Sequence, residues 1–309
     1  MTKIVFFGSD EFAAGHLEKL IAAGRCVLAC VAPPDVVKGR GMNLAVPPVK
    51  ASGLRFKIPV LQPERFDNVF IDQLKNFQAD LFVVIAYGRI LPKQVLEIPK
   101  VFSVNVHASL LPSYRGAAPI NWAIINGDKV TGLSIIRMNE KLDAGEILFQ
   151  QRIEITDRDT SVTLKTKMAE MGRGLLLKTI EAVEKREYTL TPQDEKFITF
   201  APKLAKETGH IDWNKEAIKI HNLARGLLPW PSAYTFFNGK QLKILETEVV
   251  SDDGQLSAGK VSEIHKDGFV VSTGKGAILI KKVHLADSTE MDAQNFLRGH
   301  KMELGFSFV

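Results

Sequence analysis

Residues 103–119, SVNVHASLLPSYRGAAP, constrain the fold most, because the chain changes there from a strand to a loop at a defined point. Side chains two apart on a strand point to the same face of a sheet, so Asn105 and His107 project together. The residues that alternate with them, and that can be buried on the other face, are Phe102, Val104 and Val106. The pattern predicts a strand with one apolar face and one polar face, and the polar face carries an amide and an imidazole side by side.

The loop that follows this strand is as informative as the strand. Pro112 cannot continue a strand ladder, and Gly116 loosens the backbone. Arg115 adds a guanidinium a few residues after the imidazole. Since ligands bind at the carboxyl edge of an open parallel sheet, these groups predict a functional site at that edge.

The N-terminal part has the alternation of strands and helices that is typical of a doubly wound, mostly parallel α/β sheet. A short apolar strand at residues 3–7 leads through a turn into a helix, and residues 26–32 form the next strand. Residues 79–86 form a continuous apolar run, which is typical of a central parallel strand. A dinucleotide-binding fingerprint would need glycines where the chain has Asp10 and Ala13, which argues against a nicotinamide-dependent dehydrogenase.

The C-terminal part has a different pattern. A long amphipathic helix at 161–186 is followed by a polar, aperiodic segment. Five or so short strands with Gly, Asn and Asp turns then predict a small antiparallel β-barrel of OB-like type. We therefore predict a catalytic domain at 1–189, a linker at 190–206 and a C-terminal barrel at 207–309.

Composition excludes several classes of protein. Hydrophobic residues make up 45% and charged residues 24%, as in a globular protein with a full core. The chain shows no apolar run of membrane-spanning length and no signal peptide before its first strand, so we expect a cytoplasmic protein without membrane contact. Cys26 and Cys30 fit one face of a buried strand better than a metal or redox pair. The seven scattered histidines give a metal site little support, and the net charge of +5 mildly favours an anionic partner.

The residue types at the sheet edge suit one kind of chemistry. Asn105 can donate a hydrogen bond to a developing oxyanion. A carboxylate beside His107 would set its tautomer and stabilise its protonated form, and Asp143, followed by a small residue and a glycine, lies in a nearby loop. This set fits direct attack on a carbonyl by a nucleophile that the substrate brings. A structural role for each residue is the alternative.

Residues 33–50, PPDVVKGRGMNLAVPPVK, form a second candidate functional segment. They contain four prolines and no clear periodicity, which is uncommon in a compact domain unless the segment is functional or mobile. The segment is either a solvated surface loop or a loop that orders on an anionic ligand with Arg40, between two glycines, as its principal contact.

Three of these segments resemble the signature of the folate-dependent formyltransferases: residues 105–112 (NVHASLLP), 114–119 (YRGAAP) and 142–145 (LDAG). The resemblance is closest to the methionyl-tRNA branch of that family and covers nearly the whole chain. Further matching segments are residues 4–8, 38–41, 86–88, 201–204 and 229–231. Residues 36–44 carry Val36, Val37 and Met42 where relatives often have further prolines or cations.

The resemblance implies transfer of a formyl group from 10-formyltetrahydrofolate to the α-amine of methionine esterified to initiator tRNA. It implies that Asn105 and His107 stabilise the tetrahedral oxyanion, while Asp143 orients His107 and helps to move the proton from the amine. It implies tRNA contacts from Lys38, Arg40 and the barrel. We also expect no metal and a monomer. The implied folate-binding residues are Tyr87, Gly88, Ile90, Leu91, Ser109, Leu110, Leu111 and Pro112.

Other readings remain open at this point. A formyltransferase for a sugar nucleotide or for glycinamide ribonucleotide would share the catalytic domain, although the second type is usually a shorter chain. A non-catalytic RNA-binding module with a folate-like fold is a third reading, and the intact set of Asn105, His107 and Asp143 argues against it.

Overall fold

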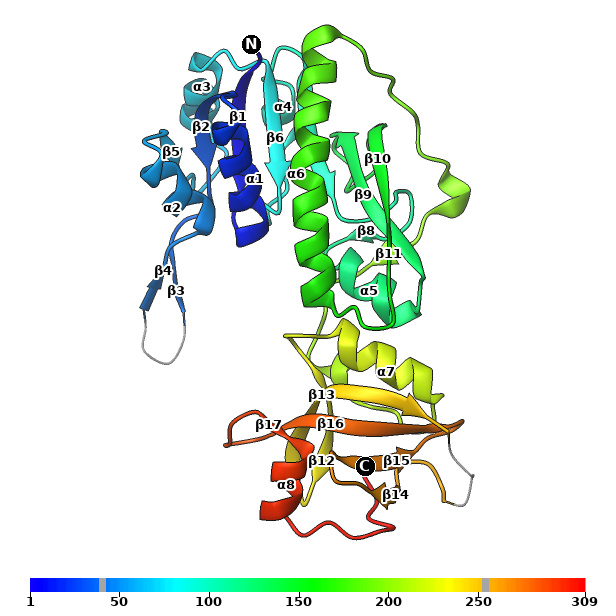
Figure 1. The fold of residues 1–309 in the computed structure, drawn as a ribbon. Helices are drawn as coiled ribbons and strands as arrows, with labels where there is room; N and C mark the ends of the chain where they lie inside the picture. Colours follow the sequence, from blue (N-terminus) through cyan, green and yellow to red (C-terminus); the bar gives the residue numbers. More distant parts are fainter. Residues whose placement is uncertain (39–42, 252–255, 309) are drawn as a thin grey trace. The chain divides into compact units, whose positions relative to one another are not determined.

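The computed structural model describes residues 1–38, 43–251 and 256–308 (Figure 1). The chain divides into two compact units, which we describe separately. Unit 1 comprises Met1–Gly116, Thr131–Ile153 and Lys165–Phe200, and unit 2 comprises Ala117–Val130, Glu154–Leu164 and Ala201–Val309. Each unit is built from three separate stretches of the chain, so the two units do not correspond to one division of the sequence. The predicted domain limits at 189 and 207 stay a prediction.

Unit 1 is built on a seven-stranded sheet. In spatial order its strands are β10 (Ile147–Glu154), β9 (Val130–Arg137), β7 (Phe102–His107), β6 (Leu81–Ile85), β1 (Lys3–Gly8), β2 (Cys26–Val31) and β5 (Val60–Leu61). The strands from β7 to β5 pair in parallel, and β9 pairs with β7 in the antiparallel sense. The predicted doubly wound, mostly parallel sheet is confirmed.

Helices cover both faces of this sheet. The helices of unit 1 are α1 (Glu11–Ala22), α2 (Pro48–Arg55), α3 (Asn68–Asn76), α4 (Lys93–Leu96) and most of α6 (Ser161–Lys185). Helices α3 and α4 contribute Phe70, Leu74 and Val95 to one core with β1 and β6. Helices α1 and α6 are in close contact at His16 and Gly172. A β-carbon at Gly172 would lie 2.6 Å from the Nε2 atom of His16. The sheet that carries the polar residues of β7 is therefore closely packed against helices.

The segment predicted as one long loop at 33–50 contains regular structure. Val36–Lys38 (β3) and Asn43–Ala45 (β4) pair in the antiparallel sense, and α2 begins at Pro48. The β-branched residues Val36 and Val37 favour a strand, and proline is well suited to the first turn of a helix. The prediction of an aperiodic loop was wrong at these described positions.

Unit 2 contains a six-stranded antiparallel sheet and three helices within its described residues. The strands run in the order β12 (Ala233–Phe237), β13 (Lys240–Val250), β16 (Ala277–Leu285), β15 (Phe269–Ser272) and β14 (Val261–Ile264), with β17 (Met291–Asp292) on β16. The helices are α5 (Pro119–Asn126), α7 (Ala217–Gly226) and α8 (Ala293–Gly299). The predicted second, all-antiparallel sheet is confirmed, and α8 was not predicted.

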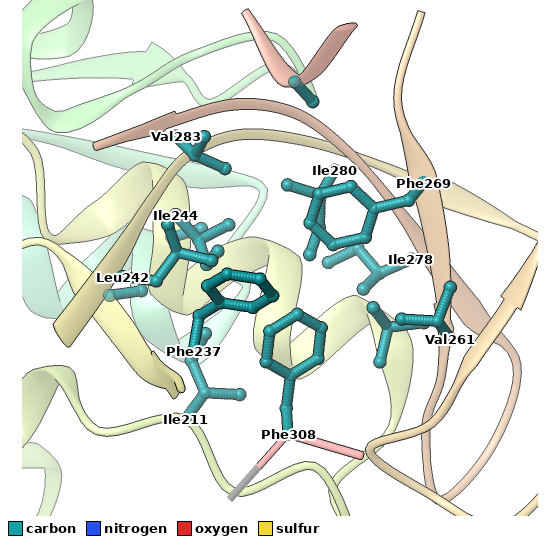
Figure 2. Close-up of a cluster of buried hydrophobic side chains, with 14 of the residues drawn as sticks. Ile211, Phe237, Leu242, Ile244, Val261, Phe269, Ile278, Ile280, Val283 and Phe308 are labelled. Carbon is teal, nitrogen blue, oxygen red and sulfur yellow. The ribbon is translucent and has the colours of Figure 1, made fainter. Parts of the chain in front are cut away.

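The strands of this sheet contribute to a hydrophobic core in which aromatic rings pack among aliphatic side chains (Figure 2). Phe308 stacks on Phe269 with ring centroids 5.9 Å apart and on Trp213 at 5.7 Å. Phe237 meets Phe296 edge-on at 5.2 Å. Because aromatic side chains bury large areas, unit 2 has a hydrophobic core of its own.

Short elements complete the chain. They are β8 (Arg115–Gly116), β11 (Phe200–Ala201) and the 3-10 turns η1 (Glu195–Phe197) and η2 (Glu207–Gly209). The region predicted as a linker at 190–206 therefore contains η1 and β11. No described helix is long and apolar enough to cross a membrane.

Candidate active site

Strand β7 holds the two polar side chains that its sequence pattern predicted. Asn105 lies opposite Ile136 of β9, and His107 lies opposite Ser134. The side chain of His107 is only 6% exposed, and Asn105 is half-buried. A strand bonded on both sides fixes its side-chain directions, so these two groups are rigidly presented.

The loop between β9 and β10 brings Asp143 to the same place. Its Oδ1 atom accepts a long hydrogen bond of 3.4 Å from Asn105 Nδ2, and its Oδ2 atom lies 3.6 Å from His107 Nδ1. Oδ2 also accepts a hydrogen bond of 2.9 Å from the backbone N–H of Gly116. The structure thus gathers the three side chains that the sequence singled out, two from strand β7 and one from the loop between β9 and β10.

The other ring nitrogen of His107 defines its tautomer. Nε2 lies 2.9 Å from the carbonyl oxygen of Tyr114. A carbonyl can only accept, so Nε2 carries the hydrogen and donates it. Nδ1 is then the atom that faces Asp143 and can gain or release a proton. This arrangement suits acid–base chemistry by the imidazole with the carboxylate beside it.

The backbone around Asp143 has an unusual conformation. Asp143 has φ +49°, in the left-handed region that non-glycine residues seldom adopt. Two residues later, a β-carbon at Gly145 would lie 1.7 Å from the carbonyl oxygen of Arg137. Glycine is therefore required there for the loop to approach the end of β9. Such strained positions persist only when the surrounding structure holds them in place.

The loop after β7 is tied down by a small network of hydroxyl and amide groups. Buried Ser109 donates from Oγ to the carbonyl of Ser113 at 2.6 Å, and its own carbonyl accepts from Ser134 Oγ at 2.7 Å. Ser134 Oγ also accepts from the N–H of Leu111 at 3.0 Å. Gln150 Nε2 donates to the carbonyl of Leu111 at 2.8 Å. Leu111 is buried, whereas Leu110 and Pro112 are half-buried and remain partly accessible.

The loop after β6 has some side chains that are buried in the core and others that are exposed to solvent. The ring of Tyr87 is 3% exposed and meets Phe7 edge-on at 5.6 Å, and Leu91 is equally buried. Burial raises the pKa of the Tyr87 phenol. Ile90, by contrast, is 79% exposed, and Gly88 adopts φ +78°. Of this loop, Gly88 and Ile90 present the accessible surface.

The predicted tRNA contacts of the 33–50 segment are Lys38 and Arg40. Arg40 lies outside the described residues. Lys38 ends β3, and its backbone pairs with Asn43 of β4. Within the described chain, no group of three or more His, Cys, Asp or Glu residues could hold a metal ion.

Three residues at this site had no assigned role in the sequence interpretation. Tyr114 supplies the carbonyl to His107, and Gly116 supplies the N–H to Asp143. Gln193, from the predicted linker, donates to the carbonyl oxygens of Asp143 and Gly145. Tyr114 and Gly116 lie in the recognised YRGAAP segment, which was the available signal, whereas a lone glutamine in an aperiodic segment offers none.

Comparison with protein families matches both parts of the chain. Residues 2–180 match the formyl transferase model, and residues 203–301 match the model of the formyl transferase C-terminal domain. The first match contains β7 and the loop of Asp143. The second contains every strand of the unit 2 sheet.

Individual relatives agree with these matches. The methionyl-tRNA formyltransferase of Halalkalibacterium halodurans is 45% identical over 309 residues, which cover 99% of this chain and 98% of the relative. The methionyl-tRNA formyltransferase of Alkaliphilus oremlandii is 40% identical over 304 residues, or 98% of each chain. Among solved structures, HypX from Aquifex aeolicus in complex with tetrahydrofolic acid has a TM-score of 0.66 at 15% identity, covering 99% of this chain and 50% of that one. This last similarity is one of fold.

Proposed function

The chain belongs to the formyl transferase family, and from that premise we propose how its residues carry out the reaction. Its function is transfer of a formyl group from 10-formyltetrahydrofolate to the α-amine of methionyl initiator tRNA. The observation that carries the proposal for the site is the convergence of Asn105, His107 and Asp143 at the end of β7.

The reaction needs no nucleophile from the protein. The α-amine attacks the formyl carbon, and the carbonyl electron pair moves to oxygen to give a tetrahedral oxyanion. An α-amino group titrates at about 7.7–8.0, so roughly a tenth to a sixth of it is unprotonated at pH 7, and no strong base is needed. The protein then has two tasks, which are to stabilise the oxyanion and to move one proton.

Asn105 performs the first task. Its Nδ2 donor is fixed by strand β7, and its present partner, Asp143 Oδ1, is 3.4 Å away. A bond of that length is weak, so the donor can turn to a developing oxyanion at little cost. Removing one such donor typically lowers turnover by about 10²- to 10³-fold.

His107 and Asp143 perform the second task. Nδ1 takes the proton that the attacking amine loses, and the Asp143 carboxylate, 3.6 Å away, stabilises the resulting imidazolium. The imidazolium adds positive charge beside the oxyanion. When the carbonyl re-forms and the bond from carbon to the folate nitrogen breaks, Nδ1 returns its proton to that nitrogen. His107 ends the cycle neutral.

The folate substrate fits the accessible parts of two neighbouring loops. Because β6 and β7 are parallel neighbours, the loops that follow them lie at the same edge of the sheet. Gly88 and Ile90 offer an apolar surface on one loop, and the half-buried Leu110 and Pro112 offer one on the other. Buried Tyr87, Leu91, Ser109 and Leu111 act as the support behind these surfaces.

The tRNA substrate is held mainly by charge. Lys38 and Arg40 of the 33–50 segment would meet the acceptor end, and unit 2 would contact phosphates further along. A net charge of +5 is consistent with such a partner. In the same proposal the protein works as a monomer in the cytoplasm.

An acceptor panel tests this function. The full-length protein is given formyl-labelled 10-formyltetrahydrofolate with methionyl initiator tRNA, an amino-sugar nucleotide or glycinamide ribonucleotide. The proposal expects label on methionine, recovered as N-formylmethionine after the ester is hydrolysed. Efficient labelling of either small acceptor, with none on methionyl-tRNA, would overturn the assignment.

A further inference from the structure

The segment at 189–200, which we name the connector, follows α6, which ends at Lys185, and runs to Phe200, the last residue of unit 1. It also spans most of the gap between the two family matches, which end at 180 and begin at 203. Its sequence is polar and aperiodic, and it was predicted to be a linker. Its contacts within unit 1 show a different role.

Gln193 of the connector is bonded to the loop of Asp143. Its Nε2 atom donates to the carbonyl oxygens of Asp143 at 2.8 Å and Gly145 at 2.7 Å. Its Oε1 atom accepts from Arg115 Nε at 3.0 Å and from Nη2 at 2.7 Å. Both hydrogens of the amide and both acceptor positions are thus in use. Arg115 thus orients the side-chain amide of Gln193, and this amide holds the loop that carries Asp143.

The loop needs such support. The left-handed backbone of Asp143, with φ +49°, is unfavourable for a residue with a β-carbon. The two hydrogens of the Gln193 amide bind the carbonyl oxygens of Asp143 and Gly145, and so hold this part of the loop in one conformation. The carboxylate of Asp143, which faces His107, can therefore be placed by the side chain of Gln193.

Thr199 makes the corresponding contact on the side of His107. Its Oγ1 atom accepts from the N–H of Tyr114 at 2.8 Å, and its carbonyl accepts from the N–H of Arg115 at 2.9 Å. Tyr114 also has a left-handed backbone, with φ +62°. The carbonyl of Tyr114 is the group that holds His107 Nε2.

Backbone pairing fixes the register of the connector. Thr191 and Ile147, the first residue of β10, exchange two hydrogen bonds of 2.8 and 2.9 Å. This pairing places Gln193 beside the loop that precedes β10. The connector therefore reaches both halves of the pair formed by His107 and Asp143.

We propose that the connector is part of the catalytic centre, with Gln193 as the positioning residue for Asp143 and Thr199 as the positioning residue for His107. The inference rests on the proposed function, because it concerns the same reaction. Neither residue touches substrate. A displacement of about 1 Å at a reacting group can lower turnover about 10²-fold, so loss of either contact should appear in kcat rather than in folate binding.

The first test replaces Gln193 in the full-length protein. Gln193→Ala removes both donors, and Gln193→Glu retains an acceptor for Arg115 but has no donor for the two carbonyls. We expect both variants to lower kcat by roughly 10- to 10²-fold, with the KM for 10-formyltetrahydrofolate within about twofold of wild type. Gln151→Ala and Gln151→Glu, on the exposed face of β10, are the matched controls and should behave like wild type. Wild-type kcat in both Gln193 variants would overturn the proposal.

A double-mutant cycle separates positioning from general loss of structure. If Gln193 acts through Asp143, then Gln193→Ala should change single-turnover rates little once Asp143 is already alanine. If Gln193→Ala lowered the rate by the same factor in the wild-type protein and in the Asp143→Ala protein, Gln193 would act elsewhere. That result would refute the positioning role. If the wild-type protein itself formylated no methionyl-tRNA, the proposed function would fail, and this outcome is distinct from either result for the variants.

Thr199 gives an independent test that does not depend on the folding of a Gln193 variant. Thr199→Val removes the hydroxyl at nearly constant volume, whereas Thr199→Ser keeps it. We expect kcat to fall about tenfold in the valine variant and to be restored in the serine variant. Thr189→Val, an exposed residue of the same connector, is the control. Equal kcat in Thr199→Val and Thr199→Ser would contradict the role of this hydroxyl.

Discussion

The Nδ1 atom of His107 lies 3.6 Å from the Oδ2 atom of Asp143, while Nε2 of the same ring donates to the carbonyl of Tyr114 at 2.9 Å. The ring is thus held at Nε2, and only Nδ1, beside the carboxylate, can exchange a proton during the reaction. The carboxylate beside it comes from a loop whose backbone is held by residues of the connector.

Asp143→Asn should lower kcat by roughly 10²-fold or more, because an amide cannot stabilise the imidazolium as a carboxylate does. The fold should persist, since the amide oxygen can still accept from the N–H of Gly116. Steady-state formylation of methionyl-tRNA measures the effect. Asp72→Asn, on the exposed surface of α3, is the control for loss of one negative charge. Wild-type kcat in Asp143→Asn would remove the carboxylate from the mechanism.

Gly145→Ala should also lower turnover by about 10²-fold, for a steric reason. The added β-carbon would lie 1.7 Å from the Arg137 carbonyl oxygen, so the loop that carries Asp143 must move. Gly174→Ala is the matched control, because nothing lies within 4 Å of a β-carbon there. Gly174 is in the interior of α6, so its replacement should raise the free energy of unfolding by roughly 0.5–1 kcal/mol. A fully active Gly145→Ala variant would show that the loop tolerates displacement.

The buried His16 of α1 should make the protein sensitive to acid. Desolvation by burial, with a smaller contribution from Arg173, lowers the pKa of His16 from 6.5 to about 4. Since the folded-state pKa is the lower one, stability is full above pH 6.5 and is lost as the pH falls from 6.5 towards 4. The shift corresponds to a loss of about 3 kcal/mol across that window.

Urea unfolding at several pH values, with wild type and His16→Gln compared, measures this loss. The variant should lose less of its free energy of unfolding between pH 6.5 and 4, because glutamine does not titrate. Neighbouring Asp10 and Glu170 are present in both proteins, so their titration affects the two curves alike. Parallel curves would assign the acid sensitivity to other groups.

Arg40→Leu should reduce turnover on methionyl-tRNA, because the 33–50 segment is expected to seat the acceptor end. If Arg40 instead meets a phosphate, the salt dependence of binding should flatten by about 0.7 to 0.9 in log–log slope. Measurements of kcat and of tRNA affinity at several salt concentrations distinguish the two cases. Unchanged values of both would leave the segment without a role in tRNA recognition.

Much of the fold could be predicted because local patterns determine it. The alternation in β7, the continuous apolar run of β6 and the long amphipathic α6 each identify an element from its own residues. Helix α8 and the hairpin of β3 and β4 are short, and short elements give too few periods to recognise. Helix α8 is stabilised by the packing of Ala293 and Phe296 in the core of unit 2, which a local pattern does not contain.

The site was predictable to the extent that its groups lie on one strand or in a recognised segment. Asn105 and His107 share a face of β7, and Asp143 lies in a segment with a family signature. Gln193 could not be identified, because its role depends on contacts with residues about fifty positions away. The ring of Tyr87 packs in the core, which the sequence did not indicate, because it does not show which way a loop side chain turns.

Single-turnover formylation of methionyl-tRNA by wild type and by His107→Ala, with saturating 10-formyltetrahydrofolate, tests the central claim most directly. The account predicts N-formylmethionyl-tRNA as the product of the wild-type enzyme. It also predicts a rate about 10²-fold lower in the variant, with both substrates bound as tightly as before. An unchanged rate in a well-folded variant that binds both substrates, or a loss explained by weaker binding alone, would contradict it.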